Sequence, residues 1–191
     1  EMPGKFTAQG VAPQCWDVAV ASMGSGGLFQ TTLWALLRNR LRGSKAFYLT
    51  VEANGKTKAR CLVMKEGMYG ERLPSLHSLQ SIANRLLPSF NCFHGPVLAR
   101  EGSRADVQML VDGVEHLADE AGVVSISFTP HPLVSVELLE PILMASGYAS
   151  RSLATLIVDL SEDFEKSMHR SGAKNARKCR RNGIAVEIVG D

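Results

Sequence analysis

Residues 46–64, A-F-Y-L-T-V-E-A-N-G-K-T-K-A-R-C-L-V-M, contain the pattern that decides the fold. Two runs rich in β-branched and aromatic side chains flank Asn54-Gly55, a pair that accepts the positive φ angles of a tight type I′ turn. The stretch therefore predicts a β-hairpin, and the rest of the chain must complete the sheet around it.

Two helices are expected before the hairpin. Residues 14–23 form a short amphipathic pattern that ends at Gly24. Residues 30–42 predict a stronger helix, whose apolar stripe consists of Leu33, Leu36, Leu37 and Leu41. Trp34, Arg38 and Arg42 follow one another on a neighbouring face of this helix.

Helices and strands alternate after the hairpin. Ser103 is expected to cap a helix that Gly122 ends, and Ser135 opens another that ends at Gly147. The inward side chains of these two helices are expected to be Val107, Leu110, Val111, Val114, Leu117 and Ala118, and then Leu138, Leu139, Ile142 and Leu143. Strands are expected at 96–99, 123–128, 154–160 and 184–189, and short helices at 78–87 and 163–168.

This order predicts the fold class. A hairpin followed by alternating helices and strands indicates an α/β (α+β) protein with a mixed, largely antiparallel central sheet flanked by helices. A chain of 191 residues with 45% hydrophobic side chains fits one ordinary globular domain, or one domain and a fragment of another.

Composition also bears on location. No apolar run approaches the ~18 to 20 residues of a membrane span, and no secretion leader is recognisable. Cys15, Cys61, Cys92 and Cys179 are scattered, which is typical of packing thiols in a reducing compartment and does not suggest a metal site. We expect a cytoplasmic protein without a transmembrane segment, with a peripheral position at the membrane as a further option.

Positive charge is concentrated near the end of the chain. Residues 170–191 carry six of the 21 Lys and Arg residues and only two of the 19 Asp and Glu residues. If residues 170–181 are helical, one stripe contains Arg170, Lys174, Arg177, Lys178 and Arg181. This stripe is either a solvated helical face or a contact for phosphate, pyrophosphate or RNA backbone, where arginine suits paired oxygens.

A known cofactor motif overlaps this stretch. Arg180, Gly183 and Ala185 match the form R-x-x-G-x-A that binds the coenzyme A pyrophosphate in GNAT acetyltransferases. The mechanism requires a strand, then the glycine loop, then a helix whose amides face the phosphate. Here the helix is expected first and a strand follows, so the match does not predict a coenzyme A site.

Several segments together resemble the Fem-like family of peptidoglycan interpeptide-bridge aminoacyltransferases. S-G-A-K-N-A-R-K-C-R-R-N-G-I-A-V-E, from Ser171 to Glu187, is similar to the family's R-N-x-R-K-A-x-K-x-G-V-x-V-x segment. F-Q-T-T-L-W-A-L-L-R, from Phe29 to Arg38, resembles F-x-Q-x-x-x-W-x-x-x-K. H-G-P-V-L at 94–98 and A-T-L-I-V-D-L-S at 154–161 resemble two family strands.

The resemblance implies both a fold and an activity. Members have two GNAT-like domains and transfer an amino acid from charged tRNA to the peptide amine of a lipid-linked or UDP-linked muramyl peptide. Residues 1–183 would form the first GNAT-like domain and residues 184–191 the opening strand of a second one, so these residues alone are expected to be inactive. No cofactor is expected, because aminoacyl-tRNA or acyl-CoA would act as the donor substrate.

Four cations are the candidate substrate-binding residues: Arg38, Lys174, Arg177 and Arg181. Arg38 stands where the family often has lysine, which replaces a compact ammonium with a planar fork. No catalytic residue is identified; His94 is expected in a turn, and His131 on a loop between two prolines. The alternatives are an interaction module whose basic helix docks on an acidic partner, nucleic acid or anionic membrane, and a single-domain GNAT N-acetyltransferase.

Overall fold

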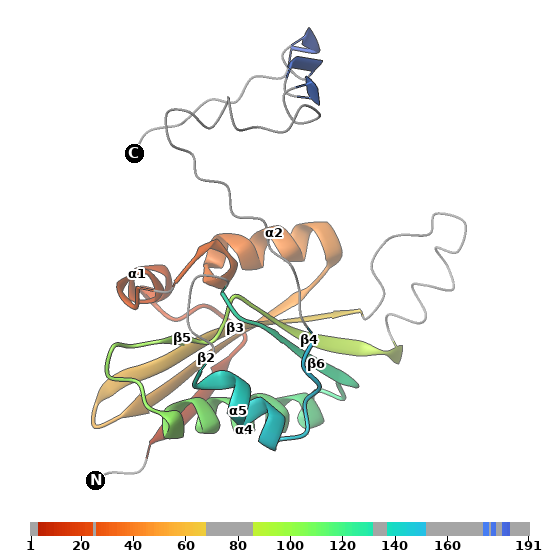
Figure 1. Cartoon of the computed structure of the whole chain (residues 1–191). Coiled ribbons are helices and arrows are strands. Elements are labelled where there is room, and N and C mark those ends of the chain that lie inside the picture. Colours follow the sequence, from red (N-terminus) through yellow and green to blue (C-terminus); the bar gives the residue numbers. More distant parts are fainter. Residues whose placement is uncertain are drawn as a thin grey trace. The chain divides into compact units, whose positions relative to one another are not determined.

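The structure is a computed structural model of the chain, and it describes residues 4–24, 26–67, 86–131, 137–151, 174–175, 177–178 and 181–183. The chain divides into two compact units, Glu1–Arg151 and Ser152–Asp191. The elements described below belong to the first unit (Figure 1). The expected boundary at residue 183 stays a prediction, because residues 184–191 lie outside the described part.

Six strands of the described residues form one mixed sheet. The strands are β1 (Lys5–Gln9), β2 (Lys45–Ala53), β3 (Lys56–Gly67), β4 (Pro88–Phe93), β5 (Val97–Leu98) and β6 (Ser125–Thr129). Their order is β1-β2-β3-β4-β6, and β5 pairs with β3. Every pair is antiparallel except β4 with β6, which is parallel. The predicted mixed, largely antiparallel sheet is confirmed.

Strands β2 and β3 form the predicted hairpin. Asn54 and Gly55 have φ angles of 54° and 71°, as a type I′ turn requires, and Ala53 pairs with Lys56 across it. The sequence patterns did not predict β1 or β4. Strand β1 is only five residues long, and Phe6 is its one large apolar side chain, so its alternating pattern is too short to identify a strand. The strand expected at 96–99 corresponds to the two-residue β5.

Helices cover both faces of the sheet (Figure 1). One face carries α1 (Trp16–Ser22), the 3-10 helix η1 (Leu28–Gln30) and α2 (Thr32–Arg42); the other carries α4 (Arg104–Glu120) and α5 (Leu139–Ala145). Strand β3 shows the alternation that two covered faces require. Cys61 and Val63 belong to the core cluster with α4, whereas Leu62 and Met64 belong to the cluster with α1 and α2.

The helices expected to end at Gly122 and at Gly147 are present as α4 and α5; Ser135, which was expected to open the second one, lies outside the described residues, and α5 begins at Leu139. Helix α4 begins after Ser103 and ends before Gly122, which has a φ of 63°. Its expected stripe is buried or packed against the core. In α5, Leu139 and Ile142 are buried, but Leu138 is 39% exposed. The expectation that Leu138 points inward is wrong, because it is the N-cap residue and the helix begins one position later.

Helix α2 packs on the sheet through an unexpected face. Ala35 is buried and Trp34 packs against the same core cluster, while Arg38 reaches Glu66 of β3. The four leucines of the predicted stripe are instead exposed, by 42% to 64%. An apolar stripe normally faces the core, so the outward position of these leucines requires an explanation.

Four expected elements lie wholly or, for the helix at 78–87, mostly outside the described residues. They are the helices at 78–87 and 163–168 and the strands at 154–160 and 184–189. These elements stay predictions.

Candidate functional site

The parallel strands β4 and β6 end next to each other. After β4 the chain turns away from β6 at His94. Phe93 pairs with Thr129, and the His94 amide then donates a 2.6 Å hydrogen bond to the Thr129 carbonyl. Beyond it the chain forms β5, which pairs with β3 and not with β6. In open sheets, the carboxyl ends of parallel strands that diverge are a common place for ligands.

Two histidines meet at this point. The ring centroids of His94 and His131 are 5.0 Å apart at an angle of 76°, and the ring of Phe29 lies 4.3 Å from that of His94. His94 has a φ of 51°, which confirms that it occupies a turn. Because His94 follows β4 and His131 follows β6, the strand ends themselves bring the two imidazoles together.

Burial lowers the pKa of His94, and the neighbouring His131 lowers it further. Both effects disfavour the imidazolium, since a charge is poorly solvated there and the neighbouring imidazole opposes a second positive charge. The lowered pKa of His94 favours its neutral form. A neutral imidazole can accept a proton from a bound substrate.

The aromatic side chains of Phe29, Trp34 and Phe93 connect the two histidines to Arg38. The Trp34 ring lies 4.7 Å from Phe29 and 6.1 Å from Phe93. The Arg38 guanidinium sits over the rings of Trp34 and Phe93, at 5.5 and 5.4 Å. The Nε1 atom of Trp34 is buried and donates to no atom of the described residues.

Arg38 is held in place by Glu66. Its Nε donates to Glu66 Oε1 at 2.7 Å, and its Nη2 donates to Glu66 Oε2. The Ser44 hydroxyl also donates to Oε1, at 2.9 Å. Only 12% of the Arg38 side chain is exposed, so this cation is largely neutralised by a buried carboxylate. Its predicted role in substrate binding stays a prediction.

Gln30 connects the segments around the site through buried hydrogen bonds. Its side chain is fully buried; Nε2 donates to the Phe93 carbonyl at 2.5 Å, and Oε1 accepts from the Leu62 amide at 2.7 Å. Its own carbonyl accepts from Trp16 Nε1 at 2.7 Å. Gly95 also packs tightly here, since a Cβ atom there would lie 2.7 Å from the Gln30 amide nitrogen. Gln30 therefore joins η1 to β3 and to the end of β4.

The other predicted cations belong to the second unit. Lys174, Arg177 and Arg181 have helical backbone conformation and are exposed. The Asn182 amide donates to the Lys178 carbonyl at 3.0 Å, and Gly183 ends the turn with a φ of 73°. Their helical conformation is as expected, while their role in substrate binding stays a prediction.

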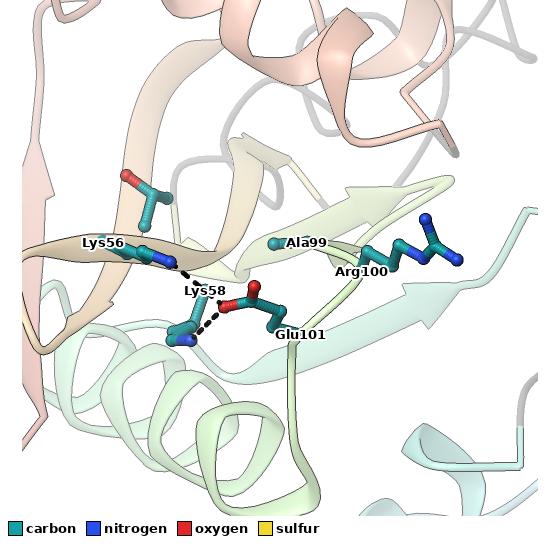
Figure 2. A pocket seen from close by; sticks show the side chains of 6 residues that line it. Lys56, Lys58, Ala99, Arg100 and Glu101 are labelled. Atoms are coloured by element: carbon teal, nitrogen blue, oxygen red, sulfur yellow. Dashed lines mark hydrogen bonds and ion pairs between the residues drawn. The ribbon is translucent and has the colours of Figure 1, made fainter.

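A second cluster of cations was missed by the sequence analysis. Lys56, Thr57 and Lys58 of β3, with residues 99–101, line a surface depression of about 230 Å³. Lys56 and Lys58 point toward Glu101, at 3.6 and 3.2 Å, whereas Arg100 points away (Figure 2). The hydrogen bond from Lys58 lowers the pKa of Glu101, as does the charge of Lys56. About 40 positions separate the two segments, so no local pattern reveals this cluster.

Within the described residues, no group of three or more His, Cys, Asp and Glu side chains is placed to hold a metal ion. Cys61 and Cys92 are buried, as expected of packing thiols, whereas Cys15 is exposed and the same expectation is wrong for it. No helix in the described ranges has both the length and the apolar character needed to cross a membrane.

Known structures share this architecture. The chain is similar to FemX, with a TM-score of 0.57 and 18% identity, over 82% of this chain and 35% of FemX. It is also similar to the aminoglycoside acetyltransferase HMB0005 from an uncultured soil metagenomic sample, with a TM-score of 0.51 and 11% identity, over 82% of this chain and 98% of that one. A predicted acetyltransferase from Clostridium acetobutylicum, solved with acetyl-CoA, has a TM-score of 0.50 and 11% identity, over 81% and 96% of the two chains.

The comparisons establish the fold. No protein-family model matches the sequence, and no curated protein matches it. The chain spans about a third of the length of FemX and nearly the whole of the two acetyltransferases. The mixed sheet and its flanking helices have the GNAT N-acyltransferase fold, as predicted.

Proposed function

We propose that this chain is a domain of an N-acyltransferase, which moves an activated acyl or aminoacyl group onto an amine. The observation that carries the proposal is that the His94 and His131 imidazoles meet at the carboxyl ends of the parallel strands β4 and β6, where burial lowers the pKa of His94. The likeness in fold to acyltransferases supports it. The reaction would then take place at the carboxyl ends of these strands.

The geometry suits the proton transfer that such a reaction needs. An acceptor amine is largely protonated near pH 7, and only its neutral form attacks a carbonyl. In this proposal His94 accepts the ammonium proton, and the nitrogen lone pair then attacks the carbonyl carbon of the donor. The bond from that carbon to the leaving oxygen or sulfur breaks, and the imidazolium returns its proton to the leaving group. The new amide nitrogen releases its remaining extra proton to water. The remaining catalysis is positioning.

The more specific part of the proposal is a Fem-like reaction. The donor would be an aminoacyl-tRNA and the acceptor a lipid-linked or UDP-linked muramyl peptide, acted on in the cytoplasm or at the membrane surface. Its support is the motif resemblance and the likeness to FemX. Arg38, Lys174, Arg177 and Arg181 would contact the anionic groups of the substrates, and a second GNAT-like domain would complete the cleft. Acyl-CoA remains the alternative donor.

The test measures transfer by the full-length protein. A labelled amino acid on tRNA and labelled acetyl-CoA are offered separately with a UDP-linked muramyl peptide as acceptor. We expect transfer from one donor, and His94→Asn should lower kcat by about 100-fold or more with little change in KM. His116→Asn, at an exposed position of α4, is the control. Absence of transfer from both donors would contradict the proposed function, and full activity of His94→Asn would contradict the role of His94.

The predicted cations are tested by binding. Replacing Arg177 and Arg181 together by Gln should weaken binding of the UDP-linked muramyl peptide or of tRNA by at least about tenfold, because each loses a charge-assisted contact. Lys5→Gln, an exposed cation on β1, is the matched control. Unchanged affinity would show that these two arginines do not contact the substrates.

A non-catalytic interaction module is the second candidate. The observation that favours it is the exposure of the described basic residues of the second unit, Lys174, Arg177, Lys178 and Arg181. Such a helix would bind RNA or an acidic partner with a strong dependence on salt. Tight binding of a short RNA, measured by fluorescence anisotropy, together with absence of transfer from either donor, would favour this second function.

A further inference from the structure

We propose that the outer face of α2 binds to the surface of an anionic lipid bilayer. This face, called the leucine face below, consists of Leu33, Leu36, Leu37 and Leu41. The inference does not depend on the proposed transfer reaction, because it rests on the exposure and charge of one helix.

The leucine face is the main exposed apolar feature of the described residues. Helix α2 carries four exposed leucines, and no other described helix or strand carries more than one large exposed apolar side chain. Their spacing of three and four residues places them on one side of the helix. The opposite side, with Trp34, Ala35 and Arg38, is occupied by contacts with the sheet.

Two further exposed apolar side chains lie on the helices that contact α2. Leu28 lies in η1, which packs beside α2, and Val18 lies in α1. Helix α1 contacts the start of α2, since Asp17 accepts hydrogen bonds from the Thr32 amide and hydroxyl at 2.7 and 2.5 Å. Leu28 and Val18 are 52% and 71% exposed.

The charge of α2 indicates which partner fits. The helix contains three arginines and no Asp or Glu. Arg38 is neutralised by Glu66, but Arg40 and Arg42 are exposed, and the exposed Lys45 follows directly. A helix that combines exposed leucines with unneutralised cations is typical of one lying in the plane of a membrane, with leucines among the acyl chains and cations among anionic headgroups.

An 11-residue helix is well suited to this position. It is about 16 Å long at 1.5 Å per residue, too short to span a bilayer but long enough to lie on one. Each exposed cation near an anionic surface strengthens binding by about fivefold. Leucine insertion and charge attraction together should give binding that is reversible and sensitive to salt.

The experiment measures binding of the whole chain to sedimented vesicles. Vesicles of phosphatidylcholine mixed with phosphatidylglycerol should bind the protein, and vesicles of phosphatidylcholine alone should bind it at least about tenfold more weakly. Replacing Leu33, Leu37 and Leu41 together by Ser should reduce binding to the anionic vesicles by at least about tenfold. Arg40→Gln with Arg42→Gln should weaken binding and reduce its dependence on salt.

A matched variant controls for loss of surface hydrophobicity. Leu86, Val124 and Met144 are exposed by 53% to 69% and lie outside α2. Replacing these three by Ser should leave vesicle binding unchanged. Equal binding of the α2 leucine variant and the wild type, or no binding to anionic vesicles, would overturn the proposal.

Two other occupants of the leucine face would also be recognised. A dimer seen by light scattering, which the α2 leucine variant dissociates, together with no binding to vesicles, would identify a second copy of the chain. A fall of several degrees in Tm of the same variant would show that the face is covered within the folded chain. Either result would overturn the lipid proposal, which expects a monomer and an unchanged Tm.

Discussion

Arg38 of α2 and Glu66 of β3 form an ion pair across 28 positions of sequence, with the guanidinium enclosed by the rings of Trp34 and Phe93. The pair lies on the side of α2 that packs on the sheet, together with Ala35 and Trp34. The leucine face lies on the other side of the helix and is exposed.

Removing one partner of this pair should destabilise the fold. Arg38→Met leaves the Glu66 carboxylate buried without its cation, which should lower the free energy of unfolding by about 3 kcal/mol. Denaturant unfolding followed by circular dichroism measures the change. The double variant with Glu66→Gln should recover a large part of the loss, because no uncompensated charge then remains.

Arg38→Lys separates the structural role from the predicted substrate role. Lysine keeps the charge but loses the two-pronged contact and the stacking on the rings, so we expect a loss of about 1 kcal/mol in the free energy of unfolding. If the variant keeps wild-type stability but loses substrate affinity, the ion pair is not the main role of Arg38.

Gln30 should be required for stability. Gln30→Leu leaves the Phe93 carbonyl and the Leu62 amide without their buried partner, so the free energy of unfolding should fall by about 3 kcal/mol. Gln108→Leu is the control, because the Gln108 amide donates its hydrogen bond to Asp112 at an exposed position. Losing this hydrogen bond should lower the free energy of unfolding by less than about 0.5 kcal/mol. Similar effects of both substitutions on denaturant unfolding would contradict this view of Gln30.

The His94 environment should make stability depend on pH. The pKa of His94 is lowered in the folded chain, so at a mildly acidic pH the unfolded chain binds more protons than the folded one. Above the unfolded pKa of about 6.5 both states are neutral and His94 contributes nothing to the dependence. Stability should fall as the pH drops below this value and level off below the folded pKa.

The variant His94→Asn tests this dependence. Asparagine tolerates the left-handed backbone at this position and has no titratable ring. The loss of unfolding free energy between about pH 7 and pH 5 should be smaller in the variant than in the wild type. An identical pH profile would show that protonation of His94 costs the folded chain nothing.

The start of α4 should depend on its cap. The Ser103 hydroxyl accepts from the Asp106 amide at 3.3 Å, and the Asp106 carboxylate accepts from the Ser103 amide at 2.8 Å. Ser103→Ala should lower the free energy of unfolding by about 1 kcal/mol. Ser127→Ala, at an exposed position of β6, should change it much less. Equal changes would show that the cap does not stabilise α4.

The sequence by itself determined the local elements whose signals lie within a few residues. The Asn54-Gly55 turn, the apolar stripe of α4 and its Ser103 cap were all recognisable, because backbone geometry and helical spacing are properties of neighbouring residues. The mixed sheet followed from the order of these elements. The class of fold was therefore predictable, although the short strand β1 and the strand β4 were not.

Only the tertiary structure decided which side chains meet. The pairing of β4 with β6 brings His94 next to His131, the β3 strand brings Glu66 to Arg38, and the loop after β5 brings Glu101 to Lys58. These contacts join segments 28 to 43 positions apart, beyond the reach of any local pattern. The same packing turned the leucines of α2 outward, because a helix presents to the sheet whichever side makes the more favourable set of contacts, and here that side carries a buried ion pair.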